Sequence, residues 1–194
     1  MAPLPHDGAR KVLKGRTRAQ SFARRLEISR ELTGYTPEDQ ARVRATSSVV
    51  LPQADAIAGA VYKHLLSHPE TAAYFMLADG RTDRAHLEER AGSLTGWLRT
   101  VIEAPLDDEF ASYAAGIGRA HTRRGGTRPS HVRGRYLVLA MSFVQSAVAG
   151  LLADAIEDRH ELAATIAAWN KLLMIQLDLF LAVYGSAEGN PRWY

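Results

Sequence analysis

Apolar residues recur at helical spacing along most of this 194-residue chain. In residues 84–101, for example, Leu87, Leu94 and Leu98 fall on one face of a helix, with charged side chains between them. No segment alternates apolar and polar residues between turns as a half-buried strand requires. The expected helices cover residues 20–32, 36–50, 52–68, 69–75, 84–101, 106–124, 132–152 and 161–184. We therefore expect an all-α protein of about eight helices.

Residues that begin and end helices stand at the expected boundaries. Thr36 is followed by Pro37 and two acidic residues, which is typical of a helix N-terminus because the hydroxyl caps free backbone N–H groups. Gly34 ends the preceding helix, and Pro105 ends the helix over 84–101. We expect the helix that begins near residue 106 to continue until the glycine pair at 125–126.

The last two helices are apolar on nearly every side. Residues 137–152 and 172–184 have an apolar surface too wide for a helix that buries a single stripe. One face is expected to meet the core and a bound apolar group. The other is expected to meet a second copy of the chain, in a homodimer held by a four-helix bundle. The alternative is a helix that runs through the middle of the fold.

We expect no membrane span. The longest apolar candidate, residues 172–184, is interrupted by Gln176 and Asp178, and no stretch reaches the roughly 18 apolar residues that a span requires. The N-terminus has no apolar signal core, so we expect a cytoplasmic protein. The lack of cysteine fits this location and excludes a disulfide framework, a cysteine-bound metal and a cysteine nucleophile.

Charge is distributed unevenly along the chain. The net charge is +3, but the first 34 residues carry +5 and the remainder carries −2. The basic character therefore belongs to a leader, which we place at residues 1–19. Because the folded body is close to neutral, we do not expect nucleic acid as its partner.

Few side chains offer catalytic or metal-binding chemistry. The chain has no phosphate-binding loop, no HExxH pair and no serine elbow. His64 and His68 have the i, i+4 spacing of a metal-binding pair. No third ligand matches them, and we expect two solvated surface histidines.

His121 is the strongest candidate for a ligand. It falls on the same helical face as Tyr113 and Ile117 and is therefore directed inward. Gly118, three residues earlier, lacks a side chain where a flat, bulky group could approach the helix. A buried histidine that only forms a hydrogen bond within the core is the alternative interpretation.

The sequence segments around His121 resemble those of a known family. The segment Ile117-Gly118-Arg119-Ala120-His121, followed by Arg135-Tyr136-Leu137-Val138, resembles the haem-ligating helix and the next helix of protoglobins and globin-coupled sensors. Further similar segments are Tyr35-Thr36-Pro37-Glu38-Asp39, Val61-Tyr62, Ser67-His68-Pro69, Ala73-Tyr74-Phe75, Leu94-Thr95-Gly96-Trp97 and Ala168-Trp169. The resemblance covers roughly residues 22–185 and implies a globin domain over 20–185, with a short extra N-terminal helix and a tail at 186–194.

The resemblance also implies a cofactor and its contacts. It implies haem b with His121 as the proximal iron ligand, and Tyr62 as the hydrogen-bond donor on the opposite, distal side. The other implied haem contacts are Phe75 as the aromatic wedge, Leu94 and Trp97 on the distal wall, Val61 where relatives often carry a larger aromatic, and Ile117. The implied function is reversible binding of O₂, CO or NO at five-coordinate iron, in a stand-alone gas sensor or carrier.

Two departures from the protoglobin pattern and two other functions stay open. Residues 90–93 are less basic than the corresponding protoglobin segment, so the residues that bind the haem propionates are unassigned. Residues 1–34 lack the aromatic-rich plug of that group. We place His86 on the outer half of its helix and therefore expect no distal histidine. The alternatives are a haem enzyme, such as an NO dioxygenase or a peroxidase-like protein, and a haem-free helical regulatory dimer. We expect gas binding rather than catalysis.

Overall fold

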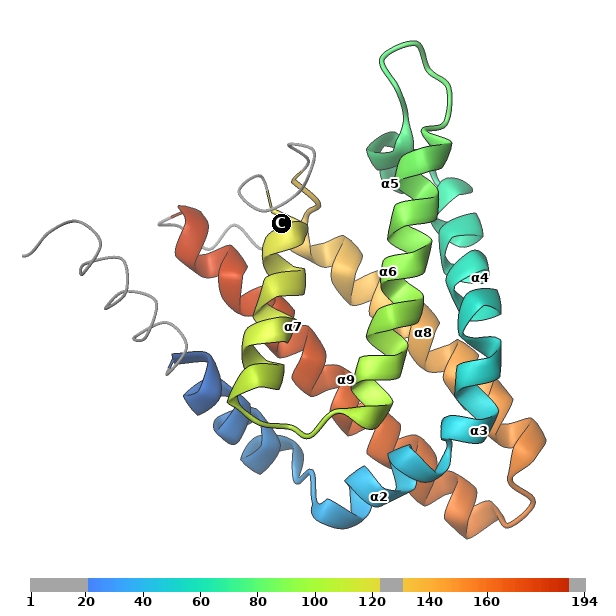
Figure 1. The fold of residues 1–194 in the computed structure, drawn as a ribbon, viewed down its shortest axis with the longest axis vertical. Helices are drawn as coiled ribbons and strands as arrows, with labels where there is room; N and C mark the ends of the chain where they lie inside the picture. The colour runs from blue at the N-terminus through green and yellow to red at the C-terminus, as the bar shows by residue number, and fades with distance from the viewer. Residues whose placement is uncertain (1–20, 123–130, 189–194) are drawn as a thin grey trace, which may run out of the picture.

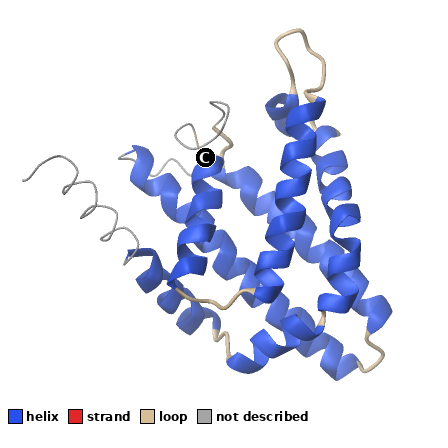
Figure 2. Ribbon diagram, viewed as in Figure 1, coloured by secondary structure: helices blue, strands red, loops and turns tan. Residues whose placement is uncertain are grey.

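A computed structural model describes residues 21–122 and 131–188, and the described chain is helical between its turns. The leader at 1–19 and most of the C-terminal tail lie outside these residues. A helix over residues 21–33 comes first. The following elements are α2 (Pro37–Ala45), α3 (Ser47–Val50), η1 (Leu51–Gln53), α4 (Ala54–Leu66), α5 (Pro69–Ala72), η2 (Ala73–Phe75), α6 (Arg84–Glu103), α7 (Asp108–Ala120), α8 (Gly134–Ala155) and α9 (Arg159–Glu188). The predicted all-α fold is confirmed, and a hairpin loop closed by Met76 and Thr82 projects beyond the helices (Figure 2).

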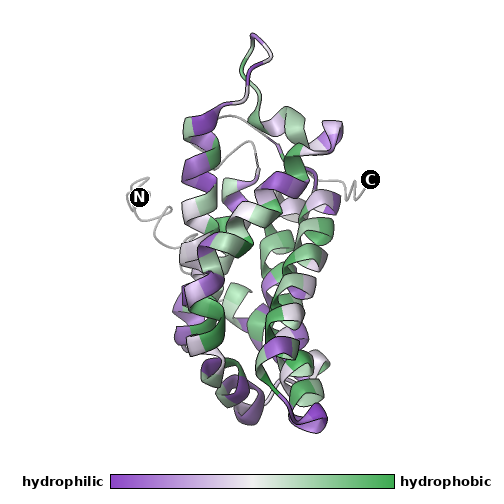
Figure 3. Ribbon diagram, turned by 90° about the vertical axis from the view of Figure 1, so that its right-hand side faces the viewer, coloured by the Kyte–Doolittle hydropathy of each residue, from purple (hydrophilic) through white to green (hydrophobic). Residues whose placement is uncertain are grey.

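Helix α9 runs through the middle of the molecule (Figure 1). It packs against α2, α7 and α8, and Leu172, Leu173 and Leu179 are fully buried. Helix α8 differs, because Val138 and Leu139 are 44% and 59% exposed. Both helices were expected to bury two faces, but they differ. Helix α9 is the central core helix, whereas α8 keeps an apolar face on the surface. In Figure 3, most of the other helices carry both hydrophobic and hydrophilic residues, as expected for helices that bury only one face.

Two helices are long and apolar enough to cross a membrane by length and composition alone. In their most apolar 18-residue windows, Gly134–Ala155 is 22% buried within the fold and Arg159–Tyr184 is 56% buried. This corrects the expectation that no stretch is sufficiently apolar, because isolated polar residues such as Gln176 do not offset their apolar neighbours. A core helix of a globular protein meets the same criteria, and this description fits α9.

The predicted start of α2 is confirmed in detail. The Thr36 hydroxyl accepts from the Asp39 N–H at 3.3 Å, and the Asp39 carboxylate accepts from the Thr36 N–H at 3.0 Å. This reciprocal capping box satisfies two backbone donors at the helix end. Gly34, with φ of +62°, ends the preceding helix in the left-handed conformation that glycine tolerates best.

The helix predicted over residues 36–50 is divided in two by Thr46. The Thr46 hydroxyl donates to the Val43 carbonyl at 2.6 Å and accepts from the indole N–H of Trp169 at 3.1 Å. Trp169 lies on α9, far away in the sequence. A tertiary hydrogen bond that local spacing cannot show therefore coincides with the end of α2 at Ala45.

Helix α7 ends earlier than expected. Asp107 caps its N-terminus by accepting from the Phe110 N–H at 3.0 Å, as the acidic start of this helix indicates. The last helical residue is Ala120, and His121 is the C-cap rather than an interior residue. The prediction that the helix continues to residues 125–126 is wrong, because the N–H of Val132 returns to the His121 carbonyl at 2.9 Å.

Gly118 lies at a close contact between two helices and not, as expected, where a bound group approaches. A Cβ at this position would lie 2.2 Å from the Phe180 carbonyl oxygen. The missing side chain therefore allows α7 to approach the backbone of α9, not a flat bound group.

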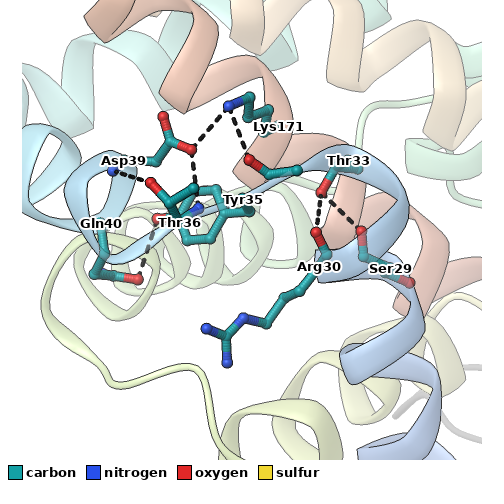
Figure 4. Close-up of polar contacts among 9 residues, drawn as sticks. Ser29, Arg30, Thr33, Tyr35, Thr36, Asp39, Gln40 and Lys171 are labelled. Carbon is teal, nitrogen blue, oxygen red and sulfur yellow. Dashed lines mark hydrogen bonds and ion pairs between the residues drawn. The ribbon is translucent and has the colours of Figure 1, made fainter.

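A polar network joins the start of α2 to α9 at the base of the molecule, near residues 34–40 (Figure 4). The Lys171 ammonium donates to the Asp39 carboxylate at 2.8 Å and to the Gly34 carbonyl at 3.0 Å. Burial opposes ionisation of Asp39, but the hydrogen bond from Lys171 and the capping N–H lower the pKa of this carboxyl overall. The base therefore holds an ionised, bonded acid between the two helices.

Candidate functional site

A large, mainly apolar cleft lies among α4, η2, α6, α7 and α8. Its volume is about 770 Å³, within the range typical of small-molecule sites. All seven predicted contact residues line it. These are Val61, Tyr62, Phe75, Leu94, Trp97, Ile117 and His121. Residues that are up to 60 positions apart in the sequence therefore face one cavity, and this is the arrangement that binding of one ligand requires.

His121 presents one ring nitrogen that is already engaged. Its Nδ1 lies 2.8 Å from the Ile117 carbonyl oxygen, one turn earlier on α7. A carbonyl can only accept, so Nδ1 carries the proton and Nε2 of the neutral ring keeps a free lone pair. Orientation through the opposite nitrogen is the usual arrangement for a metal-binding histidine.

The environment of His121 keeps its ring neutral. Burial lowers the pKa of His121, the bond to Ile117 opposes this effect, and the positive charge of Arg90 lowers the pKa further. Because the ordinary value is already 6.5, the imidazole is uncharged near neutral pH and able to coordinate a metal.

Tyr62 reaches the cleft from α4. Its hydroxyl donates to the Arg90 carbonyl at 3.1 Å, and its ring meets Phe75 edge-on with 5.5 Å between ring centroids. Burial raises the pKa of Tyr62 to about 12, although the charge of Arg90 opposes this effect. The group is therefore a protonated donor at any physiological pH.

Four polar residues of α6 also line the cleft, although the sequence patterns did not place them there. His86, Arg90, Ser93 and Thr100 share the cavity with Leu94. Placing His86 on the outer half of α6 was wrong: its side chain is 14% exposed, and its ring lies 5.8 Å from that of Phe75. The spacing of 86, 90 and 94, one residue every turn, could have revealed this shared face.

The histidine pair on α4 lies outside the cleft. Both His64 and His68 are exposed, and His64 stacks on Phe143 with 4.8 Å between ring centroids. Within residues 21–122 and 131–188, no group of three or more histidine and acidic side chains could hold a metal ion. The expectation of two surface histidines agrees with this exposure.

The chemistry of the cleft fits a haem. It combines an apolar wall, an imidazole with one free nitrogen and, on Arg90, a buried Nε atom that has no partner among the described residues. Haem needs an apolar surface for its macrocycle, an axial base for iron and a cation for its carboxylates.

Comparisons with known proteins give one family and one fold. The family model described as Protoglobin matches residues 22–189. Among solved structures, the chain is similar to the globin domain of the Geobacter sulfurreducens globin-coupled sensor. The TM-score is 0.68 and the identity 22%, over 81% of this chain and 96% of that one. A search of curated proteins finds no match.

Proposed function

Because the chain belongs to the protoglobin family, we propose that its cleft binds haem b through His121 and that the protein binds O₂, CO and NO reversibly, as a gas sensor or carrier. The observation that carries this proposal is the orientation of His121: its Nδ1 is bonded to the Ile117 carbonyl, which leaves Nε2 available beside a cavity of about 770 Å³. When bound, the haem iron supplies an open coordination position for a diatomic gas.

Side chains of this protein supply the lining of the cleft and the polar contact to the gas. Phe75, Leu94 and Trp97 give the cleft an apolar lining, which suits a macrocycle. Tyr62 lines the cleft and would supply the hydroxyl that donates to a bound O₂, in place of its bond to the Arg90 carbonyl. The Arg90 carbonyl would keep an intrahelical partner after losing this bond, because Arg90 lies inside α6, Arg84–Glu103. CO is a much weaker acceptor, so the same hydroxyl favours O₂ over CO.

The visible spectrum of the purified protein tests the proposal. The protein is produced with ample haem precursor and measured ferric, then reduced, then with CO. We expect a Soret band that shifts at each step and is lost in His121→Ala. The exposed His64 provides a matched control, and His64→Ala should keep the band. A colourless wild-type protein, or an unchanged band in His121→Ala, would contradict the proposal and favour the haem-free helical bundle.

We also propose that the protein acts in the cytoplasm as a homodimer, paired through α8 and the adjoining surface of α9. The exposed Val138 and Leu139 support this pairing, because water contact with a large apolar helix face is unfavourable. Light scattering should give the mass of two chains for the wild type and of one chain for Leu139→Lys. Leu32, 84% exposed on the helix over 21–33, is the control, and Leu32→Lys should stay dimeric. A monomeric wild type would contradict this proposal.

A further inference from the structure

Arg90 is the one lysine or arginine among the described residues that line the cleft. Its side chain is 25% exposed, yet its Nε atom is buried and has no hydrogen-bond partner within residues 21–122 and 131–188. A buried guanidinium N–H without an acceptor is unfavourable, and native proteins keep few such groups. The cleft therefore contains an unfilled place for an acceptor.

The outer edge of the same guanidinium already holds a carboxylate. Arg90 Nη2 lies 2.6 Å from Oε1 of Glu89, whose side chain is 46% exposed. Neighbouring residues on a helix do not face one another, so Glu89 reaches Arg90 from the side, at the water-exposed rim. Water weakens this pair, and a second carboxylate can compete for the guanidinium.

Arg90 also shares one face of α6 with apolar residues of the cleft. It lies one turn before Leu94 and two turns before Trp97 on the same face of α6, and both of those residues line the cleft. Arg90 lies in the interior of α6, Arg84–Glu103, so the backbone that carries the guanidinium is held by the helix itself. Its Nε has no partner among the described residues and is available to an anionic ligand.

We propose that Arg90 binds a propionate carboxylate of the haem through Nε and a terminal N–H, and that Glu89 holds the guanidinium at the cleft mouth until the cofactor arrives. This inference rests on the proposed haem-binding function. A planar guanidinium matches the two oxygens of a carboxylate, and such charge-assisted pairs are stronger than neutral hydrogen bonds. Arg90 therefore supplies the propionate contact that the weakly basic segment 90–93 left unassigned.

The rate at which ferric protein loses haem to an excess of a haem-scavenging globin tests this contact. Two cofactors are compared: native haem, and haem whose two propionates are methyl esters. We expect Arg90→Gln to speed the loss of native haem by about tenfold, as for one charge-assisted hydrogen bond. It should leave the loss of the diester unchanged, because the diester has no carboxylate to bind.

Two further variants make the result specific. Arg99 lies on the same helix, is 61% exposed and pairs with Glu103 away from the cleft, so Arg99→Gln should retain haem as the wild type does. Glu89→Gln removes the competing carboxylate and should hold native haem at least as firmly as the wild type. Circular dichroism confirms that each variant is folded. If Arg90→Gln does not fold, Arg90→Lys takes its place, because lysine keeps the charge but lacks the planar guanidinium.

Each contrary result has a distinct meaning. If Arg90→Gln loses both cofactors faster by the same factor, Arg90 acts through packing and the inference is wrong. Equal rates for the wild type and Arg90→Gln with native haem would also overturn it. If Glu89→Gln loses native haem as fast as Arg90→Gln, the Glu89 pair itself supports the cleft and the propionate contact is refuted. A wild type that takes up neither cofactor refutes the proposed function itself.

Discussion

The base of the molecule and the cleft use charged side chains in opposite ways. At the base, Lys171 bridges the Asp39 carboxylate and the Gly34 carbonyl and so joins α9 to residues more than 130 positions away (Figure 4). In the cleft, Arg90 pairs only with its sequence neighbour Glu89 and keeps a buried Nε without a partner among the described residues. At the base the charged groups Lys171 and Asp39 are paired with each other inside the fold, whereas the cleft has a cation and space for a ligand. A charge of the first kind supports the packing of distant helices, and a charge of the second kind is available to a ligand.

The largest expected effect comes from Gly118, where α7 meets α9 between the two regions. A Cβ would lie 2.2 Å from a backbone oxygen that cannot move away alone. Gly118→Ala should therefore lower the free energy of unfolding by about 3 kcal/mol, as severe overpacking does. Urea denaturation of the haem-free protein measures this loss.

Gly92, on α6, provides the matched control. Nothing lies within 4 Å of a Cβ at this position. Gly92→Ala should stabilise the protein by up to about 1 kcal/mol, because alanine is the better helix former. Equal effects at the two glycines would show that α7 and α9 are not in close contact.

The second prediction concerns the cleft alone. Tyr62→Phe removes the hydroxyl that we expect to donate to O₂, a bond of roughly 1.5–3 kcal/mol to a partly charged acceptor. Release of O₂ should accelerate at least about tenfold, while release of CO barely changes. Flash photolysis and stopped-flow measurements give both rates. Equal changes for the two gases would remove Tyr62 from this role.

The third prediction concerns the base alone. Lys171→Met leaves the Asp39 carboxylate, whose side chain is 9% exposed, without its cation. We expect a loss of about 1–2 kcal/mol in the free energy of unfolding at neutral pH, with no change in the haem spectrum. The exposed Lys63 is the control, and Lys63→Met should stay within about 0.5 kcal/mol of the wild type.

The acid dependence sharpens this third test. The pKa of Asp39 is lowered in the fold, so its stabilising effect is present above its ordinary value of 3.8 and is lost as the pH falls further. The difference between Lys171→Met and the wild type should therefore shrink in acid. A difference that stays constant through this range would contradict a role for the ion pair.

The last and smallest expected effect is that the O₂ release rate stays constant as the pH is raised to 10. The pKa of Tyr62 is raised to about 12, so the hydroxyl stays protonated where an ordinary tyrosine, with a pKa of 10, is half ionised. The O₂ release rate should remain constant from neutral pH up to pH 10. The stabilisation that Tyr62 gives is complete below its ordinary pKa and is lost as the pH rises toward 12. Acceleration of O₂ release with a midpoint at pH 10 would show that this tyrosine is not buried.

Local patterns predicted the elements whose causes lie within a few residues. The Thr36 capping box and the Gly34 turn are of this kind, since both depend on backbone groups within three residues. The seven candidate contacts were found through a resemblance in their order and spacing, and the structure brings all seven to one cavity. Their chemical roles stay predictions until the spectra and rates are measured.

The predictions that were wrong concern positions whose structure depends on residues far away in the sequence. Thr46 ends a helix where its hydroxyl meets Trp169, and Gly118 is needed because of the backbone at Phe180. His86 was misplaced because helical periodicity orders residues around one helix but does not say which neighbour covers each face.

The sequence by itself determined the helical class, most helix ends and the inward direction of His121, because these follow from backbone hydrogen bonding and from the period of the helix. Only the tertiary structure decided that α9 is the central helix, that α8 keeps an apolar face outside the core of its own chain and that Arg90 lines the cleft. Each of these depends on which distant segment packs against a given face, and packing of whole side chains between helices settles that choice.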